Sequence, residues 1–73
     1  MSDYNWSVTA VYACENKVTT ESIGYYTMDN GFAQFIDYVE AFRIGYEGYE
    51  WHVSLFDCST NKRCCYVTSY DFR

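Results

Sequence analysis

The fold is decided by residues 29–45, which read DNGFAQFIDYVEAFRIG. At about 100° of rotation per residue, the large apolar side chains fall within one stripe of a helix: Phe32, Phe35, Ile36, Val39 and Phe42. Asp37 falls opposite this stripe, and Glu40 lies near its boundary. The pattern predicts an amphipathic helix that buries one face against another layer of the protein.

Both ends of this helix have recognisable signals. Asp29 or Asn30 can accept hydrogen bonds from the free amides of the first turn. Arg43 falls in the last turn, where its stem can cover the core while its charge favours the helix C-terminus. Gly45 suits the position after the last turn, so we expect the helix to end there.

Four further stretches predict β-strands. Residues 4–14 alternate apolar and polar side chains, and residues 18–27 are rich in β-branched and tyrosine side chains. After the helix, residues 51–58 and 63–72 have strand patterns separated by a short polar turn. The order β-β-α-β-β predicts an α+β fold in one small domain, residues 1–73. We expect a four-stranded, mostly antiparallel sheet with the helix packed on one face.

The expected register of the last hairpin follows from pairing Cys58 with Arg63. It gives two large cross-strand pairs on one face, Trp51 with Tyr70 and Leu55 with Tyr66. In the second strand, Gly24 is expected to mark a bulge or bend. The aromatic side chains predicted in the core are Trp6, Tyr12, Phe32, Phe35, Phe42, Trp51, Tyr66 and Tyr70.

Composition excludes several classes of function. The chain has 73 residues, 49% of them hydrophobic, so it is too apolar for a disordered tail and too short for two lobes around a catalytic groove. Ten acidic and five basic residues give a net charge of −5, which disfavours direct binding to nucleic acid. No apolar run approaches the roughly 18 residues of a membrane span, so no membrane partner is expected.

The cysteines are predicted to be reduced thiols in a cytoplasmic protein. The chain begins MSDY, without the basic and apolar regions of a signal peptide. The alternative is a zinc site made by the four cysteines and the single histidine: Cys14, Cys58, Cys64, Cys65 and His52. Their spacing matches no common zinc motif, and adjacent residues on a strand point to opposite faces. We therefore expect no metal site and no cofactor.

No catalytic residues are predicted. Carboxylates are spread along the chain, and a single helix on a sheet offers little cleft in which a pair could act. His52 lies on a predicted strand beside a tryptophan, and we interpret it as a half-buried packing residue. The glycines of the loop at 45–50 enclose tyrosine and glutamate, which do not suit a phosphate. The sequence therefore predicts a protein without enzymatic activity.

A binding surface is the stronger prediction, because tyrosine gives a large contact area at low entropic cost. The sixteen aromatic side chains, nine of them tyrosines, exceed what one helix-on-sheet core can hold. The predicted partner-binding residues come from the loop and from the outer helix face: Tyr46, Glu47, Tyr49, Glu50, Asp37 and Glu40. Such a surface suits a basic partner. The alternatives are that the tyrosines cover the end of the core and that the carboxylates serve solubility.

Taken together, the acidic, aromatic composition and the order of elements resemble the small anti-CRISPR and host-takeover proteins of bacteriophages. The elements that carry the resemblance are Trp6–Cys14, Val18–Thr27, Phe32–Ile44, Trp51–Cys58 and Arg63–Phe72. Membership would imply a protein-binding inhibitor in the host cytoplasm. It would block the nucleic-acid-binding site of a CRISPR effector subunit without chemistry. Independently of the resemblance, the acidic surface could imitate the charge of a nucleic-acid backbone.

Two other readings stay open. Val11, Phe56 and Val67 are expected on the sheet face away from the helix, where they could form the seam of a homodimer. The second reading is a metal-binding or redox protein based on the cysteines.

Overall fold

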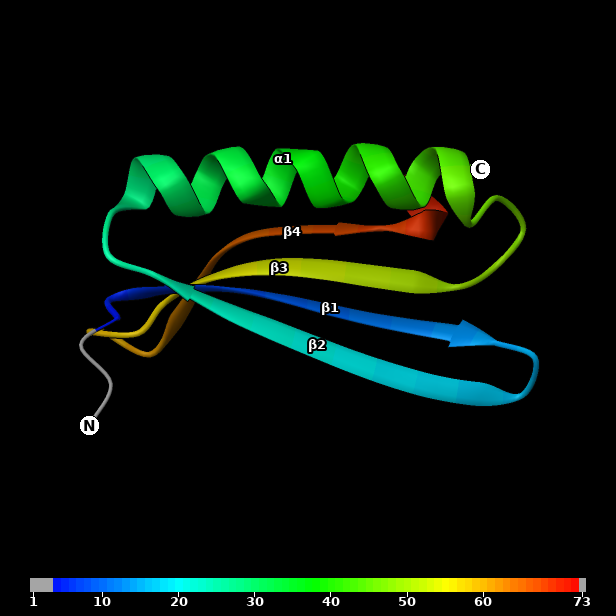
Figure 1. Ribbon diagram of the computed structural model, residues 1–73, viewed down its shortest axis with the longest axis horizontal. Coiled ribbons are helices and arrows are strands. Elements are labelled where there is room, and N and C mark those ends of the chain that lie inside the picture. Colours follow the sequence, from blue (N-terminus) through cyan, green and yellow to red (C-terminus); the bar gives the residue numbers. More distant parts are fainter. Residues whose placement is uncertain (1–3, 73) are drawn as a thin grey trace.

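Four antiparallel strands form one open sheet in the order β2-β1-β3-β4, and a single helix lies along one of its faces (Figure 1). The computed structural model describes residues 4–72, so the first residues, on which the localisation prediction partly rests, lie outside the described part. The elements are β1 (Trp6–Cys14), β2 (Lys17–Tyr25), α1 (Met28–Gly45), β3 (Trp51–Asp57), β4 (Lys62–Thr68) and the 3-10 helix η1 (Ser69–Phe72). The predicted α+β fold with β-β-α-β-β order is confirmed.

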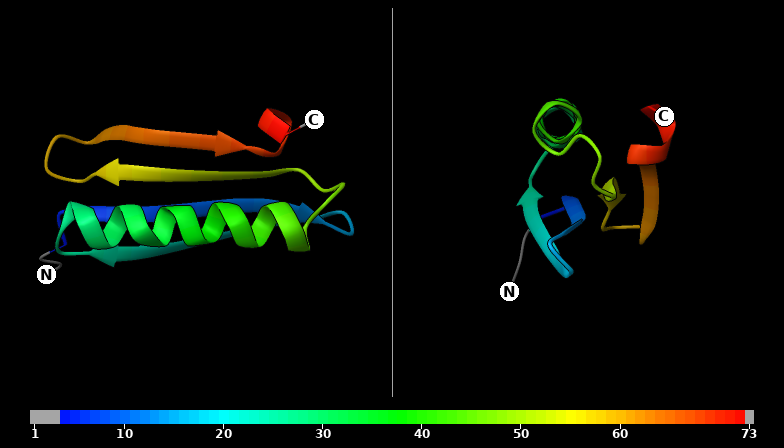
Figure 2. Two further views of the ribbon diagram at one scale, coloured as in Figure 1. Left: turned by 90° about the horizontal axis from the view of Figure 1, so that it is seen from above. Right: turned by 90° about the vertical axis from the view of Figure 1, so that its right-hand side faces the viewer.

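The helix does not cover the sheet evenly. Seen from above, α1 runs over β1, and β4 lies to one side beyond β3 (Figure 2). The helix-side face of β4 is therefore only partly sheltered. Cys65 and Val67 of β4 are only partly buried against the core.

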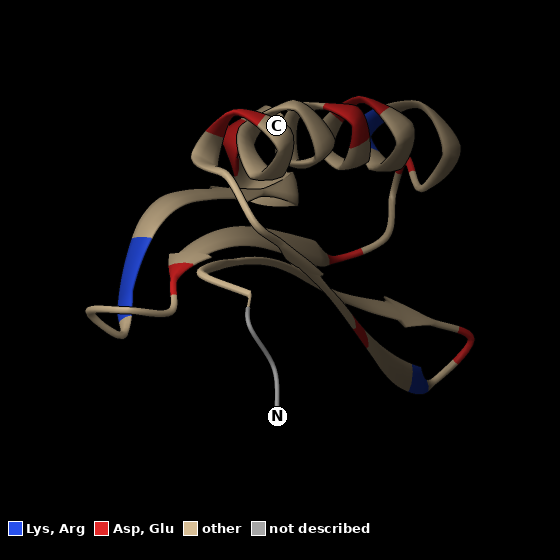
Figure 3. Ribbon diagram, turned by 60° about the vertical axis from the view of Figure 1, so that its left-hand side comes forward, with Lys and Arg blue, Asp and Glu red and all other residues tan. Residues whose placement is uncertain are grey.

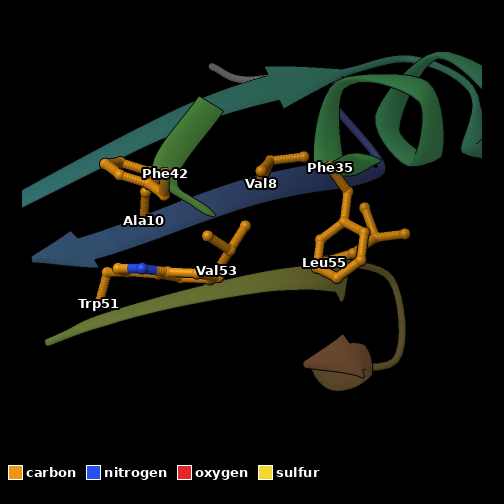
Figure 4. Close-up of a cluster of buried hydrophobic side chains, with 7 residues drawn as sticks. All are labelled: Val8, Ala10, Phe35, Phe42, Trp51, Val53 and Leu55. Carbon is orange, nitrogen blue, oxygen red and sulfur yellow. The ribbon is translucent and has the colours of Figure 1, made fainter. Parts of the chain in front are cut away.

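The core lies between α1 and the two central strands (Figure 4). Side chains of β1 and β3 alternate across the sheet, so every second residue faces the helix. The buried hydrophobic residues are Val8, Ala10, Phe35, Phe42, Trp51, Val53 and Leu55. Burying a side chain such as that of Leu55 contributes about 1.5–3 kcal/mol, which makes this cluster the main source of stability.

The predicted aromatic core is partly wrong. Phe35, Phe42 and Trp51 are buried as expected, and Trp6 and Tyr12 are partly buried against them. In contrast, three aromatic side chains are exposed: Phe32 by 43%, Tyr66 by 45% and Tyr70 by 54%. Phe32 lies at the margin of the apolar stripe of α1. Tyr66 is misplaced because the predicted hairpin register was wrong, and Tyr70 because β4 ends before it.

The register of β3 and β4 differs from the expected one by one residue. Leu55 pairs with Cys65, whereas Tyr66 pairs with Ser54. A register shift between Leu55 and Phe56 places an extra residue, Cys64, in β4. A shift of one residue moves a side chain to the other face of the sheet. Tyr66 therefore lies on the face opposite the helix, which we call the open face.

The ends of two elements also differ from expectation. The strand predicted over residues 63–72 ends at Thr68, where η1 begins, so Tyr70 has no partner in β3. The helix cap is Thr27 rather than Asp29 or Asn30, since the Oγ1 of Thr27 accepts a hydrogen bond from the backbone N–H of Asn30 at 3.2 Å. The helix ends at Gly45, as expected, although Gly45 is its last helical residue and Tyr46 is the C-cap.

The expected bulge at Gly24 is absent. The ladder between β1 and β2 runs from Trp6–Tyr25 to Cys14–Lys17 without a shift. Gly24 is instead close to the ring of Tyr4, which leaves no space for a larger side chain.

Candidate functional site

The outer face of α1 presents carboxylates to solvent. Asp37, Glu40 and Ile44 recur every three or four residues, so they share the side of the helix that faces away from Phe35 and Phe42. All three are exposed, and Ile44 is 80% exposed. Glu47 lies two residues beyond the end of α1. We call Asp37, Glu40, Ile44 and Glu47 the acidic face.

The acidic face has no basic partner in the described part of the chain. Among residues 4–72, no Lys or Arg forms a salt bridge with Asp37, Glu40 or Glu47. The guanidinium of Arg43 lies instead over the ring of Phe72, 5.0 Å from its centroid. Figure 3 shows Asp and Glu along the outside of α1 and the other basic positions at the tips of the two hairpins. Carboxylates therefore predominate on the outside of α1, and the acidic face projects a negative potential, whereas at the hairpins basic and acidic residues lie together.

Beyond the end of α1 lies a hollow of about 310 Å³. It is walled by residues from α1, the following loop, β3 and η1: Arg43, Tyr46, Glu47, Gly48, Tyr49, Trp51, Ser69 and Phe72. Gly48 has a φ of 90°, which a residue with a side chain rarely adopts, and this turn carries the chain from Glu47 to Tyr49. A neighbouring depression joins Glu40, Arg43, Ile44 and Glu47. The acidic face and the hollow are therefore continuous.

The two loop tyrosines have different environments. The ring of Tyr46 is half-buried, with its centroid 4.8 Å from that of Phe42 and 5.1 Å from that of Tyr12. Tyr49 stands outside Tyr46, with its ring centroid 6.2 Å away, and is 41% exposed. Tyr46 thus covers the end of the core, as the alternative interpretation had it, and Tyr49 is the ring available to a partner.

Glu50 is separated from the other predicted residues. It precedes the buried Trp51, so strand alternation turns its side chain to the open face with His52. Its two carboxylate oxygens accept hydrogen bonds there, Oε1 from the hydroxyl of Tyr70 and Oε2 from the ring of His52. The structure therefore brings together Asp37, Glu40, Glu47 and Tyr49 over a half-buried Tyr46 and places Glu50 elsewhere.

The open face carries a hydrogen-bonded group that we call the open-face cluster: Glu50, His52, Tyr66 and Tyr70. The Nδ1 of His52 lies 2.6 Å from the Tyr66 hydroxyl, and its Nε2 lies 3.2 Å from Glu50 Oε2. This cluster was not predicted from the sequence, because Tyr66 was assigned to the core. Glu50 directly precedes β3 and His52 is the second residue of β3, so their two-residue spacing was the available signal.

Of the three apolar residues expected on the open face, two lie there and one lies on the helix side of the sheet. Val11 and Phe56 point to it, because each follows a residue buried beneath the helix, Ala10 and Leu55 respectively. Val67 pairs with the fully buried Val53 and faces the helix instead. The prediction for Val67 was wrong for the same reason as that for Tyr66.

Three side chains have pKa values that are shifted by burial or by their immediate neighbours. A hydrogen bond donated to Glu21 at 2.7 Å raises the pKa of Tyr12 to about 12. Burial raises the pKa of Tyr25, and nearby Tyr38 and Asp37 raise it further. Hydrogen bonds from Ser59 lower the pKa of Asp57. None of these groups belongs to a cleft with paired acid and base.

The four cysteines are free thiols: Cys14, Cys58, Cys64 and Cys65. Within residues 4–72, no group of three His, Cys, Asp or Glu side chains converges as a metal site requires. In the same part of the chain, no helix has the length and apolar character needed to cross a membrane.

Comparison with known proteins gives no relative. No protein-family model, no curated protein and no solved structure matches this chain. Its function must therefore be argued from its own residues.

Proposed function

We propose that the protein acts without catalysis, by binding a basic surface of another protein through the acidic face. The observation that carries the proposal is the group of carboxylates around the exposed Ile44, Asp37, Glu40 and Glu47, which form no salt bridge with any residue between 4 and 72. Unpaired carboxylates attract a basic partner and speed its approach. The apolar side chain of Ile44 adds area that is removed from water in the complex.

Tyr49 and the adjoining hollow give this surface a specific contact. An arginine of the partner can lie against the Tyr49 ring and pair with Glu47 at the same time. Contacts of this kind, between aromatic rings and arginine, dominate the energy of many protein interfaces. The partner is therefore expected to present arginine rather than lysine.

In its more specific form, the proposal is that this protein inhibits a nucleic-acid-binding protein of a host cell. Sites for nucleic acid are rich in Lys and Arg because they neutralise phosphates. A carboxylate-bearing helix that occupies such a site excludes the nucleic acid by competition. A subunit of a CRISPR effector, in a bacterial cytoplasm, is the partner that the anti-CRISPR resemblance implies.

The test is retention of proteins from a bacterial lysate by the immobilised chain, quantified by mass spectrometry. Glu40→Lys is compared with Glu15→Lys, which changes the net charge equally but lies in the hairpin turn between β1 and β2. We expect a basic, nucleic-acid-binding protein to be retained by the wild type and by Glu15→Lys and lost with Glu40→Lys. Equal retention by both variants would reject the acidic face as the binding surface.

The alternative of a homodimer through the open face has less support. Only Val11 and Phe56 of its three expected residues lie there, and the polar open-face cluster occupies part of the same surface. Size-exclusion chromatography with light scattering separates the two proposals: the inhibitor proposal expects a monomer, and a stable dimer would favour the alternative.

A further inference from the structure

The side chains of the open-face cluster are linked by consecutive hydrogen bonds, with His52 at the centre. The side chain of His52 is 28% exposed and contacts a hydroxyl on one side of its ring and a carboxylate on the other. The rings of His52 and Tyr66 are nearly parallel, with an interplanar angle of 15° and centroids 5.9 Å apart. Glu50 is itself held by the Tyr70 hydroxyl at 2.6 Å. Tyr70, Glu50, His52 and Tyr66 thus form one chain of hydrogen bonds that ends at the Tyr66 phenol.

The direction of each hydrogen bond follows from the chemistry of the groups. A carboxylate can only accept, so Nε2 of a neutral His52 carries the proton that faces Glu50. Nδ1 is then an unprotonated acceptor, and the Tyr66 hydroxyl donates to it. A base that is within 2.6–3.2 Å of a hydroxyl and is oriented by a third group is the arrangement that activates nucleophiles.

We propose that Tyr66 is an activated phenol that accepts an acyl group from an activated ester. In this step, Oη of Tyr66 forms a bond to the carbonyl carbon of the ester, and the bond from that carbon to the leaving oxygen breaks. The phenol proton passes to Nδ1 of His52, and the leaving group departs as an alkoxide or phenoxide. Deprotonation of His52 by solvent completes the transfer and leaves an acyl ester on Tyr66.

Each neighbour has a separate part in this step. His52 takes the proton as the general base. Glu50 is a positioning residue, because it fixes the tautomer of His52 and stabilises the imidazolium. The guanidinium of Arg63 lies 4.0 Å from the centroid of the Tyr66 ring, where its positive charge favours the developing phenolate.

No other tyrosine has this arrangement, since the chain contains one histidine. Tyr12 and Tyr70 donate their hydroxyl protons to carboxylates, and the bond to Glu21 makes Tyr12 harder to ionise. Tyr26 is the best comparison, because it is 64% exposed against 45% for Tyr66. Exposure alone would therefore make Tyr26 the more reactive of the two.

The test is acetylation of the full chain by p-nitrophenyl acetate, with the modified residues located by mass spectrometry. Fragment spectra must separate Tyr66 from its neighbours Cys64 and Cys65, whose thiols also react. We expect Tyr66 to be acetylated at least about 10-fold faster than Tyr26, as general-base assistance would produce. Labelling that follows exposure, with Tyr26 faster than Tyr66, would overturn the proposal without any variant.

Single variants then test the roles of His52 and Glu50 in the acetylation of Tyr66. His52→Gln keeps a polar side chain but has no basic nitrogen, so the Tyr66 rate should fall to that of Tyr26 while the circular dichroism spectrum is unchanged. Glu50→Gln should slow Tyr66, and Glu50→Asp should restore part of the rate, which a purely structural role would not produce. An unchanged Tyr66 rate in folded His52→Gln would contradict the proposal. The acidic face takes no part in this reaction, so its failure as a binding surface would leave the result unaffected.

Discussion

The ring of Tyr4 lies against Gly24, so closely that a Cβ at position 24 would overlap the ring atoms Cγ and Cδ2. Tyr4 is also in contact with Tyr26, with the ring centroids 4.9 Å apart. The segment before β1 is thereby held against the end of β2. Gly24 is required here for the close approach of a ring and not for a bend of the strand.

Replacing Gly24 with alanine should therefore destabilise the protein. Forcing a methyl group into occupied space typically costs about 1–3 kcal/mol. The free energy of unfolding, measured by urea denaturation, should fall by this amount. In the double variant Gly24→Ala, Tyr4→Ala, the cost of the alanine at 24 should largely disappear. Strict additivity of the two single variants would contradict the contact.

The N-cap of α1 gives a second prediction. Thr27→Ala removes the oxygen that accepts from the Asn30 amide and should cost about 1 kcal/mol. Asn30→Ala is the matched control, because it leaves that backbone hydrogen bond intact and should cost less. Thermal unfolding of both variants measures the difference. A larger loss of stability for Asn30→Ala than for Thr27→Ala would contradict Thr27 as the cap and favour Asn30, one of the two residues that the sequence predicted.

Substitutions of the two loop tyrosines should have different effects: loss of Tyr46 should lower stability, and loss of Tyr49 should weaken binding. Tyr46→Ala removes ring contacts with Phe42 and Tyr12 and should destabilise the fold by about 1–3 kcal/mol. Tyr49→Ala should leave the unfolding temperature nearly unchanged and weaken binding to the partner. Thermal unfolding and an affinity measurement on each single variant check both statements. A Tyr49→Ala variant with full affinity would remove Tyr49 from the interface.

Asp57 should make stability depend on pH. Its Oδ1 accepts hydrogen bonds from the N–H of Ser59 at 3.0 Å and from its hydroxyl at 2.6 Å, and these bonds lower its pKa below the ordinary 3.8. The stabilisation is therefore present above about pH 4 and is lost as the pH falls through the pKa of the folded state. Asp57→Asn should lower the unfolding temperature at pH 7, and the difference from the wild type should shrink in acid. A difference that persists unchanged below the folded pKa would contradict this linkage.

Much of the fold could be predicted from local patterns. The helix stripe around Phe35 and Phe42 and the alternation of Val8 and Ala10 are properties of neighbouring residues, and both are confirmed. The predicted strands of β1, β2 and β3 differ from the structure by at most two residues at either end. These elements depend on periodicity, which a single sequence contains.

Several of the differences between the predicted and the observed structure result from one extra residue in β4. The extra residue at Cys64 reverses the faces of Tyr66 and Val67, and nothing in the sequence CCYVT indicates that reversal. The errors at Tyr66 and Val67 follow from it, and so does the failure to predict the open-face cluster. Phe32 lies at the margin of the helix stripe, and Tyr70 lies beyond the end of β4. The acidic face was predictable because Asp37 and Glu40 lie on a helix whose buried stripe was clear. Glu50 was assigned to the loop surface, although the alternation of β3, extended back by one residue, turns its side chain to the open face.

The most direct test of the proposed function is the affinity of the chain for the protein it retains, measured by titration calorimetry at increasing salt. The Debye length falls from about 30 Å at 0.01 M salt to about 8 Å at 0.15 M, so attraction to exposed carboxylates should be screened over this range. We expect the affinity to fall steadily with salt in the wild type and to be weak and nearly independent of salt in Glu40→Lys. An affinity for the wild type that stays constant from 0.01 to 0.15 M would contradict binding through the acidic face.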